Sequence, residues 1–176
     1  MSDVMRLFLS ENSIRGHKEY LAELKLKYSV LVKSEPRLSD LSLDKIHKQN
    51  LKNDIKIEAV TLLSEIKAHE IYFSSFTEGR GKYEKIKKKY LSADSLRYEI
   101  FSLAKRVHTG FLFVLQGRGE IRIDTCDKPP YFIKQTPLLA LDLCEHSYFI
   151  DYGFHRDEYL RQAVGYLDLS KIEEYL

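Results

Sequence analysis

The sequence predicts an α+β protein in which an N-terminal antiparallel helical hairpin is followed by a C-terminal α/β domain with a three-stranded antiparallel sheet. Three observations support this class. Residues 14–76 carry apolar side chains at three- and four-residue steps, which is typical of amphipathic helices. Residues 111–125 contain an apolar run, a glycine-rich turn and an alternating segment, which together indicate a β-hairpin. A short, nearly all-apolar run at 137–143 predicts a third strand that is buried on both faces.

The elements of the first half follow from caps and breaks. Ser13 can cap a helix over residues 14–33. The segment SEPRLSD at 34–40 is typical of a turn. A second long helix is expected over residues 44–76, and it would pair with the first as an antiparallel hairpin.

The segment TEGRGK at 77–82 has two glycines and no apolar residue, so we place a boundary there, between a helical hairpin domain at 1–78 and a C-terminal α/β domain at 79–176. A charged helix face is expected at 82–90. Ser92 can cap a helix that ends near residue 107. Short helical pieces should complete the chain beyond residue 145.

Composition narrows the class of protein. The 176 residues carry 28 Lys and Arg against 26 Asp and Glu, a net charge of +2, which argues against a dedicated nucleic-acid binder. Two cysteines cannot build a disulfide framework. No apolar run approaches the roughly 20 residues that span a bilayer, and the first residues do not resemble a signal peptide. We therefore expect a cytoplasmic protein that binds neither nucleic acid nor membrane.

Four residues have the chemistry of metal ligands. His17, His69 and His146 lie where an inward-facing position is expected. Asp142 lies at the end of an apolar strand, where an unpaired carboxylate is costly. Three imidazoles and one carboxylate suit Mn, Fe or Zn. Simpler interpretations exist for each of them. They are an exposed helix histidine for His17, a hydrogen-bonded interface residue for His69, and a structural Asp–His pair for the other two.

Several segments resemble the iron/manganese superoxide dismutases. LDLCEHSYFIDY at 141–152, followed by HRDEYL at 155–160, is similar to the C-terminal signature of that family. LSENSIRGH at 9–17 and AHEIYF at 68–73 resemble the segments that hold its first two ligands, and TGFLFVL at 109–115 resembles a strand of its sheet. The four segments occur in the family's order and with roughly its spacing.

The resemblance implies a specific chemistry. The ligands of one Fe or Mn ion per subunit would be His17, His69, Asp142 and His146, and the substrate would be superoxide, converted to O2 and H2O2. In the family, a Glu at the position of Glu145 bridges to the last His ligand of the opposite subunit, which implies a homodimer through Glu145 and His146.

The sequence also departs from the family's pattern. Lys25 and Leu21 occupy the positions of a Tyr and a His that line the family's substrate channel, and Phe149 replaces the Tyr that pairs with that His. The Gln that hydrogen-bonds metal-bound solvent is absent from both of its known places, which hold Cys126 and Glu65 here. The family's pocket tryptophans are replaced by Phe73, Phe111, Phe113 and Cys144.

These departures leave two hypotheses. In the first, the protein is an active dismutase in which Lys25 attracts the anion and Glu65 or Cys126 contacts metal-bound solvent. The alternative roles of these three residues are a solvated surface lysine, an exposed helix residue and a small buried hydrophobe. In the second, the fold serves as a metal-binding or structural protein with little or no dismutase activity. Another redox or oxygen chemistry at the same centre stays open.

Overall fold

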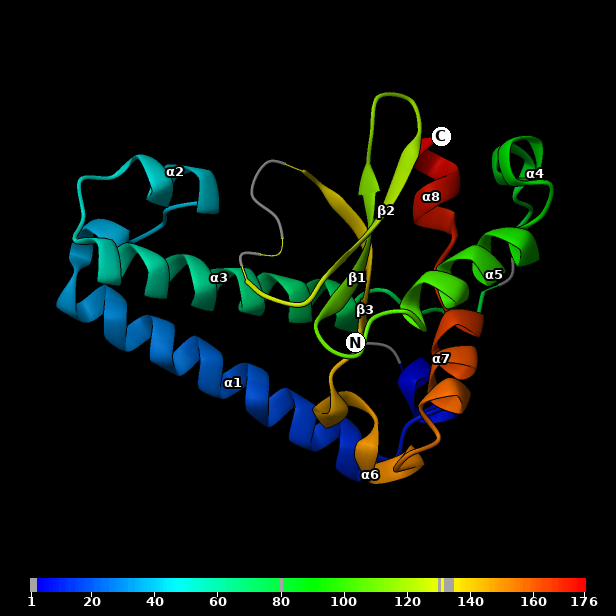
Figure 1. Cartoon of the computed structure of the whole chain (residues 1–176), viewed down its shortest axis with the longest axis horizontal. Coiled ribbons are helices and arrows are strands. Elements are labelled where there is room, and N and C mark those ends of the chain that lie inside the picture. The colour runs from blue at the N-terminus through cyan, green and yellow to red at the C-terminus, as the bar shows by residue number, and fades with distance from the viewer. Residues whose placement is uncertain (1–2, 80, 130, 132–134) are drawn as a thin grey trace.

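The computed structural model describes residues 3–79, 81–129, 131 and 135–176, and its elements follow the predicted order (Figure 1). In these ranges the helices are α1 (Glu11–Ser34), α2 (Leu43–Lys48), α3 (Asn53–Phe73), α4 (Glu84–Tyr90), α5 (Ala93–Ala104), α6 (Phe149–Tyr152), α7 (Arg156–Gly165) and α8 (Ser170–Tyr175). The strands are β1 (Phe111–Gln116), β2 (Ile121–Cys126) and β3 (Pro137–Asp142). Short 3-10 helices are η1 (Asp3–Leu7), η2 (Pro36–Leu38) and η3 (Glu145–Ser147).

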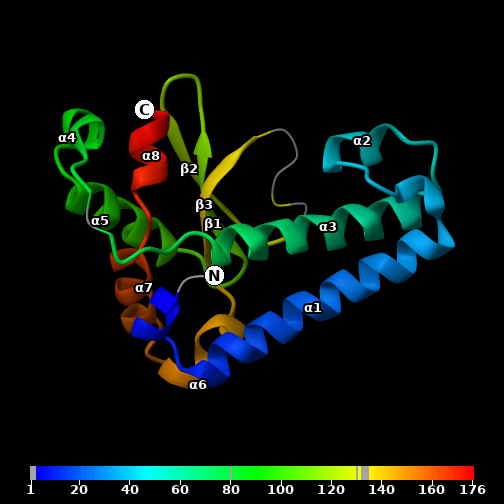
Figure 2. The ribbon, with the colours of Figure 1, turned by 180° about the vertical axis from the view of Figure 1, so that it is seen from behind.

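Helices α1 and α3 form the hairpin that the sequence predicts. They pack against each other and run in opposite directions, as both views of the ribbon show (Figures 1 and 2). The buried positions of α1 recur at three- and four-residue steps, at Ile14, His17, Leu21 and Leu24. One stripe of the helix therefore faces the interior, and a histidine lies in that stripe among aliphatic residues.

The prediction of a single helix over residues 44–76 is wrong, because the helix is interrupted between α2 and α3. Gln49 is extended after the last turn of α2, and Lys52 is extended before the first turn of α3. The break lets α2 fold back onto α3, so that Leu43 and Ile46 are buried. A continuous helix would have carried those two apolar side chains away from this contact.

The predicted cap of the first helix is also wrong by one turn. The helix begins at Glu11, and Ser10 is the residue with extended backbone before it. The Ser10 hydroxyl accepts a hydrogen bond from the backbone N–H of Ser13 at 3.2 Å. Ser13 itself points inward, and its Oγ is buried without a hydrogen-bond partner. The predicted cap Ser92 is confirmed, since its side chain accepts from the N–H of Ser95.

A pair of substitutions distinguishes the two serines. We expect Ser10→Ala to lower the free energy of unfolding by about 1 kcal/mol, because it removes a helix cap. Ser13→Ala should be neutral or slightly stabilising, because it removes a buried hydroxyl that has no partner. Urea unfolding followed by circular dichroism measures both values. If Ser13→Ala were the more destabilising change, our assignment of the cap would be incorrect.

The sheet has the order β2-β1-β3, and both pairings are antiparallel. β1 is the central strand, with Phe111 opposite Cys126 on one side and Asp142 on the other. Helix α3 packs against β3, while α5 contacts β2 and α7 (Figure 2). Residues 139–142 of β3 are buried, as expected. The sheet therefore brings the end of β3 next to the hairpin.

The C-terminal residues form the predicted short helical pieces, η3, α6, α7 and α8. The division into domains at 1–78 and 79–176 stays a prediction, and Arg80 of the boundary segment lies outside the described residues. No helix within the described ranges is both long and apolar enough to cross a bilayer.

Candidate metal centre

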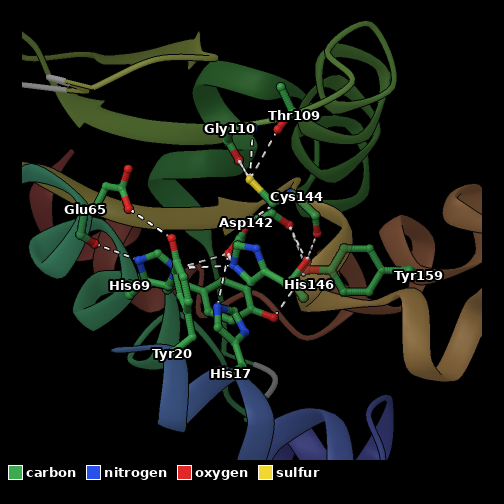
Figure 3. A network of polar contacts seen from close by, with 12 residues as sticks. His17, Tyr20, Glu65, His69, Thr109, Gly110, Asp142, Cys144, His146 and Tyr159 are labelled. Carbon is green, nitrogen blue, oxygen red and sulfur yellow. Dashed lines mark hydrogen bonds and ion pairs between the residues drawn. The ribbon is translucent and has the colours of Figure 1, made fainter. Parts of the chain in front are cut away.

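Four side chains from four elements meet where the hairpin contacts the sheet. His17 comes from α1, His69 from α3, Asp142 from the end of β3 and His146 from η3 (Figure 3). One ligand atom from each of them lies within 4.8 Å of the others. The four residues predicted as metal ligands are therefore brought together. We call these four residues the ligand cluster.

The distances in the ligand cluster suit a single ion. Asp142 Oδ2 lies 3.1 Å from His17 Nε2, 3.0 Å from His146 Nε2 and 3.5 Å from His69 Nε2. The Nε2 atoms of His69 and His146 are 3.4 Å apart. Ligand atoms at about 2.1 Å from a metal, at angles of about 90–120°, lie about 3.0–3.6 Å from each other. The cluster therefore has the spacing of a mononuclear coordination shell.

Burial gives a second indication of a metal site. His17, His69 and Asp142 are 2%, 1% and 0% exposed. Among the side chains that the structure describes, Asp142 Oδ2 and both ring nitrogens of His17 are buried without a well-oriented hydrogen bond, although Asp142 Oδ2 and His17 Nε2 are only 3.1 Å apart. Buried polar atoms of native proteins normally have a hydrogen-bond partner. A cation bound between these atoms would interact with both the carboxylate oxygen and an imidazole lone pair. The exposed interpretation of His17 is wrong.

Neighbouring groups orient two of the ligands. The Nδ1–H of His69 donates to the backbone carbonyl of Glu65 at 2.7 Å, which leaves the Nε2 lone pair directed at the cluster. The backbone N–H of Cys144 donates to Asp142 Oδ1 at 2.8 Å, so that Oδ2 is left for the cluster. The Tyr159 hydroxyl donates to the backbone carbonyl of Asp142 at 2.9 Å and fixes the end of β3.

The protonation states favour cation binding. Burial alone would raise the pKa of Asp142, but the adjacent His146 and His17 outweigh it and hold the pKa well below its usual value. Burial lowers the pKa of His69 to about 4, so this imidazole is neutral at physiological pH. Burial would also lower the pKa of His146, yet contact with Asp142 reverses this effect and raises it. A proton on His146 is therefore the main competitor of a metal ion.

A pH dependence of metal retention follows. We expect the bound fraction of Fe or Mn to fall as pH drops through the raised pKa of His146, with one proton taken up per ion released. In the metal-free protein, protonated His146 contributes stability fully below its ordinary pKa of 6.5, and this contribution is lost as pH rises through the folded-state pKa. Equilibrium dialysis with elemental analysis measures the first effect. Retention that stays constant from about pH 8 to about pH 5 would contradict it.

Aromatic rings surround the buried side of the cluster. The ring of His17 lies 5.0 Å from the rings of both Tyr72 and Phe73. The ring of His69 meets Phe111 edge-on at 5.1 Å. Phe73 and Phe111, at positions where the resemblance to the family places tryptophans, thus contact ligand imidazoles. They keep this side of the site apolar, which strengthens electrostatic interactions within it.

Cys144 is at another position where the resemblance places a tryptophan, and its side chain contacts the residue before β1. Its Sγ accepts a hydrogen bond from the backbone N–H of Gly110 at 3.2 Å. Burial, and then the charge of Asp142, raise the pKa of this thiol to about 12, so it stays protonated. The side chain therefore joins the end of β3 to the residue before β1.

The three residues proposed for catalysis are placed differently. Glu65 lies next to the cluster, because its backbone carbonyl accepts from His69 and its carboxylate accepts from Tyr20. Lys25 is half-exposed and forms an ion pair with Glu70 at 2.6 Å. The thiol of Cys126 donates to the backbone carbonyl of Lys128 at 3.0 Å. The catalytic roles of all three stay predictions.

Two tyrosines near the site were missed by the sequence reasoning. The ring of Tyr20 lies 4.7 Å from that of His146 and 5.3 Å from that of His69. Burial, and then the charge of Glu65, raise the pKa of Tyr20 to about 12. Tyr131 packs on Phe111 at 5.0 Å. The position of Tyr20, one helical turn after His17, was the available signal.

Comparison with known families agrees with this geometry. A family model described as "Iron/manganese superoxide dismutases, C-terminal domain" matches residues 80–175, more than half of the chain. The match includes Asp142 and His146, and the structure adds His17 and His69 from the hairpin. The family uses Fe or Mn, and its substrate is superoxide. With a matching C-terminal half and a complete set of three histidines and one aspartate, this chain belongs to the iron/manganese superoxide dismutase family.

Proposed function

We propose that the protein is an Fe- or Mn-dependent superoxide dismutase that holds one ion per subunit in the ligand cluster. The observation that carries this proposal is the convergence of His17, His69, Asp142 and His146 on one buried point. When bound, such an ion supplies a one-electron couple that converts two superoxide ions and two protons to O2 and H2O2. The net charge of the site is set by one carboxylate among three imidazoles.

In this reaction the chain's own residues would hold the ion and orient the ligand side chains. Asp142 supplies the one negative ligand, and the N–H of Cys144 fixes its orientation. The carbonyl of Glu65 fixes the tautomer of His69. The rings of Tyr72 and Phe73 exclude water from the side of His17. These contacts hold the ligand atoms in place before the ion arrives, which limits the reorganisation that binding requires.

A second candidate function has its own support. The Cys126 thiol is hydrogen-bonded to a backbone carbonyl, and Lys25 is ion-paired with Glu70. Neither contact is directed at the ligand cluster. This arrangement favours a metal-binding or structural protein of the same family with little or no dismutase activity.

One experiment separates the two functions. The protein is loaded with Fe or with Mn, its metal content is measured by elemental analysis, and superoxide decay is followed after pulse radiolysis. Asp142→Asn serves as the matched protein without the negative ligand. Stoichiometric metal with decay that rises in proportion to protein supports the dismutase. Stoichiometric metal with no acceleration supports a metal-binding protein without dismutase activity. No retained metal overturns the dismutase and supports the structural role.

We also propose a homodimer formed through Glu145 and His146. His146 is the one member of the ligand cluster with a substantially exposed side chain, at 36%, and Glu145 beside it is exposed. Phe149, Ile150 and Phe154 are 45%, 65% and 94% exposed, so the same end of the chain presents apolar surface. A second copy that covers this surface would shield the cluster from water.

Sedimentation velocity at micromolar concentration tests the dimer. We expect a dimer for the wild-type protein and dissociation for Glu145→Ala. Glu174→Ala, on α8, is a control that should stay dimeric. A wild-type monomer would overturn the proposal.

A further inference from the structure

The ring of Tyr20 lies against two imidazoles of the ligand cluster, and one of them, His146, has a side chain that is 36% exposed. Its ring is tilted by 39° over His146 and by 56° over His69. Figure 3 shows the phenol standing beside the two imidazoles, with its hydroxyl directed at Glu65. Tyr20 is only half-buried, so part of its side chain reaches the surface beside these imidazoles, whereas the ring of His17 is enclosed by Tyr72 and Phe73.

Its place in the sequence is specific to this chain. Tyr20 is three positions after His17, one turn further along α1, and therefore lies on the neighbouring part of the same face. The eighth position after His17 holds Lys25, which is paired with Glu70. An aromatic phenol at this site thus comes from a different part of the helix than the resemblance to the family implies.

One turn of α3 holds both the ring and a ligand in place. The Tyr20 hydroxyl donates to the Glu65 carboxylate at 3.2 Å. The backbone carbonyl of the same Glu65 accepts from His69 Nδ1 at 2.7 Å. The hydrogen bond between Tyr20 and Glu65 therefore joins α1 to α3 beside the cluster.

We propose that Tyr20 is the gate of this site, held closed by Glu65, and that its position limits the access of small anions to the metal. The proposal rests on the proposed function only in taking superoxide as the anion that passes. Tyr20 contacts ligand imidazoles rather than the ion. It therefore acts on the access of anions and not on the reacting atoms. Opening requires the phenol to leave Glu65 and the ring to move off His146.

Access is tested first on the metal-free protein, by the rate at which diethyl pyrocarbonate modifies His146 and His69, read by peptide mass spectrometry. Tyr20→Phe keeps the ring but removes the hydrogen bond to Glu65. We expect both histidines to be modified about fivefold faster, which corresponds to about 1 kcal/mol. Tyr20→Ala should give a larger increase. Modification of His47 and His155, which are exposed, should stay unchanged and serves as the internal reference.

Two further variants separate a gate from a general loosening of α1. Tyr28→Phe removes a phenol from the same helix, where it donates to the Leu38 carbonyl, and should leave the rates unchanged. Glu65→Gln retains an acceptor oxygen for Tyr20, so His146 and His69 of the metal-free variant should be modified at the wild-type rates, whereas Glu65→Ala should give the rates of Tyr20→Phe. Unchanged rates in both Tyr20 variants, or equal increases in Tyr28→Phe, would overturn the gate.

The metal-loaded protein gives the second measurement. Azide, a small anion, is titrated against the Fe-loaded protein while its charge-transfer absorption is followed, and we expect faster binding in Tyr20→Phe than in the wild type or Tyr28→Phe. Equal azide binding rates in all three proteins would overturn the gate for anions. If the wild type retains no metal, the proposed function fails, and the modification rates alone decide whether Tyr20 controls access.

Discussion

Replacement of Asp142 with Asn is expected to abolish metal retention and, with it, superoxide dismutation. The variant removes the one negative ligand, and its amide would present either an oxygen of lower charge or an N–H to the three imidazoles. Loss of a partner outside the coordination shell already costs about 10–100-fold in metal affinity, so loss of this ligand should cost more than about 100-fold. Elemental analysis after dialysis and pulse radiolysis measure the two effects.

A matched control separates the ligand from the loss of one negative charge. Asp124→Asn, on β2, changes an aspartate that is partly exposed and paired with Arg122. It should retain the full complement of metal. Stoichiometric Fe or Mn in Asp142→Asn would show that the ion does not depend on this carboxylate.

The second large effect is expected at Gly110, which precedes β1. This residue has a φ of +91°, and an added Cβ would lie 2.1 Å from the backbone oxygen of Cys126. Gly110→Ala therefore combines strain with a clash against backbone that cannot move without breaking the β1–β2 pairing. We expect a loss of about 3–5 kcal/mol of unfolding free energy, at the high end for single substitutions. Urea or thermal unfolding measures it.

Gly119, in the β1–β2 turn, provides the control for backbone strain alone. Its φ is +73°, but an added Cβ would meet no atom within 4 Å. Gly119→Ala should cost about 1 kcal/mol. Equal losses in the two variants would mean that the close approach to Cys126 is not what requires glycine at position 110.

The sequence was most informative about elements with strong local patterns. The hairpin of β1 and β2 and the apolar strand β3 form close to the predicted positions, because alternation and glycine turns are local signals. The break between α2 and α3 was missed because Leu43 and Ile46 continue a helical apolar pattern, and only their contact with α3 shows that they fold back. The cap of the first helix was missed for a similar reason, because only the folded structure shows that Ser13 faces inward and that Ser10 is the cap.

The candidate site was predictable in its ligands but not in its surroundings. Asp142 ends a buried strand and His146 follows it by four residues, so the sequence already indicated a pair of ligands there. His17 lies among charged neighbours, and its burial arises only when α1 docks on α3 and the sheet. Tyr20 was missed for the same reason, because its ring contacts His146 from a distant part of the chain. The spacing of Tyr20 from His17 was a local signal, but nothing in the local pattern indicated the contact with His146.

The arrangement of the ligand cluster has a consequence for the intact chain. His69 and His146 are 77 positions apart, and the ligands come from the two long helices as well as from the region after the sheet. A single bound ion would join segments that are far apart in the chain, and because the site forms only when the chain folds, its binding free energy would add to the stability of the folded state. After a single protease cut between α3 and α4, the ion would still be bound by ligands from both fragments and would hold them together. A chelator would then release the fragments.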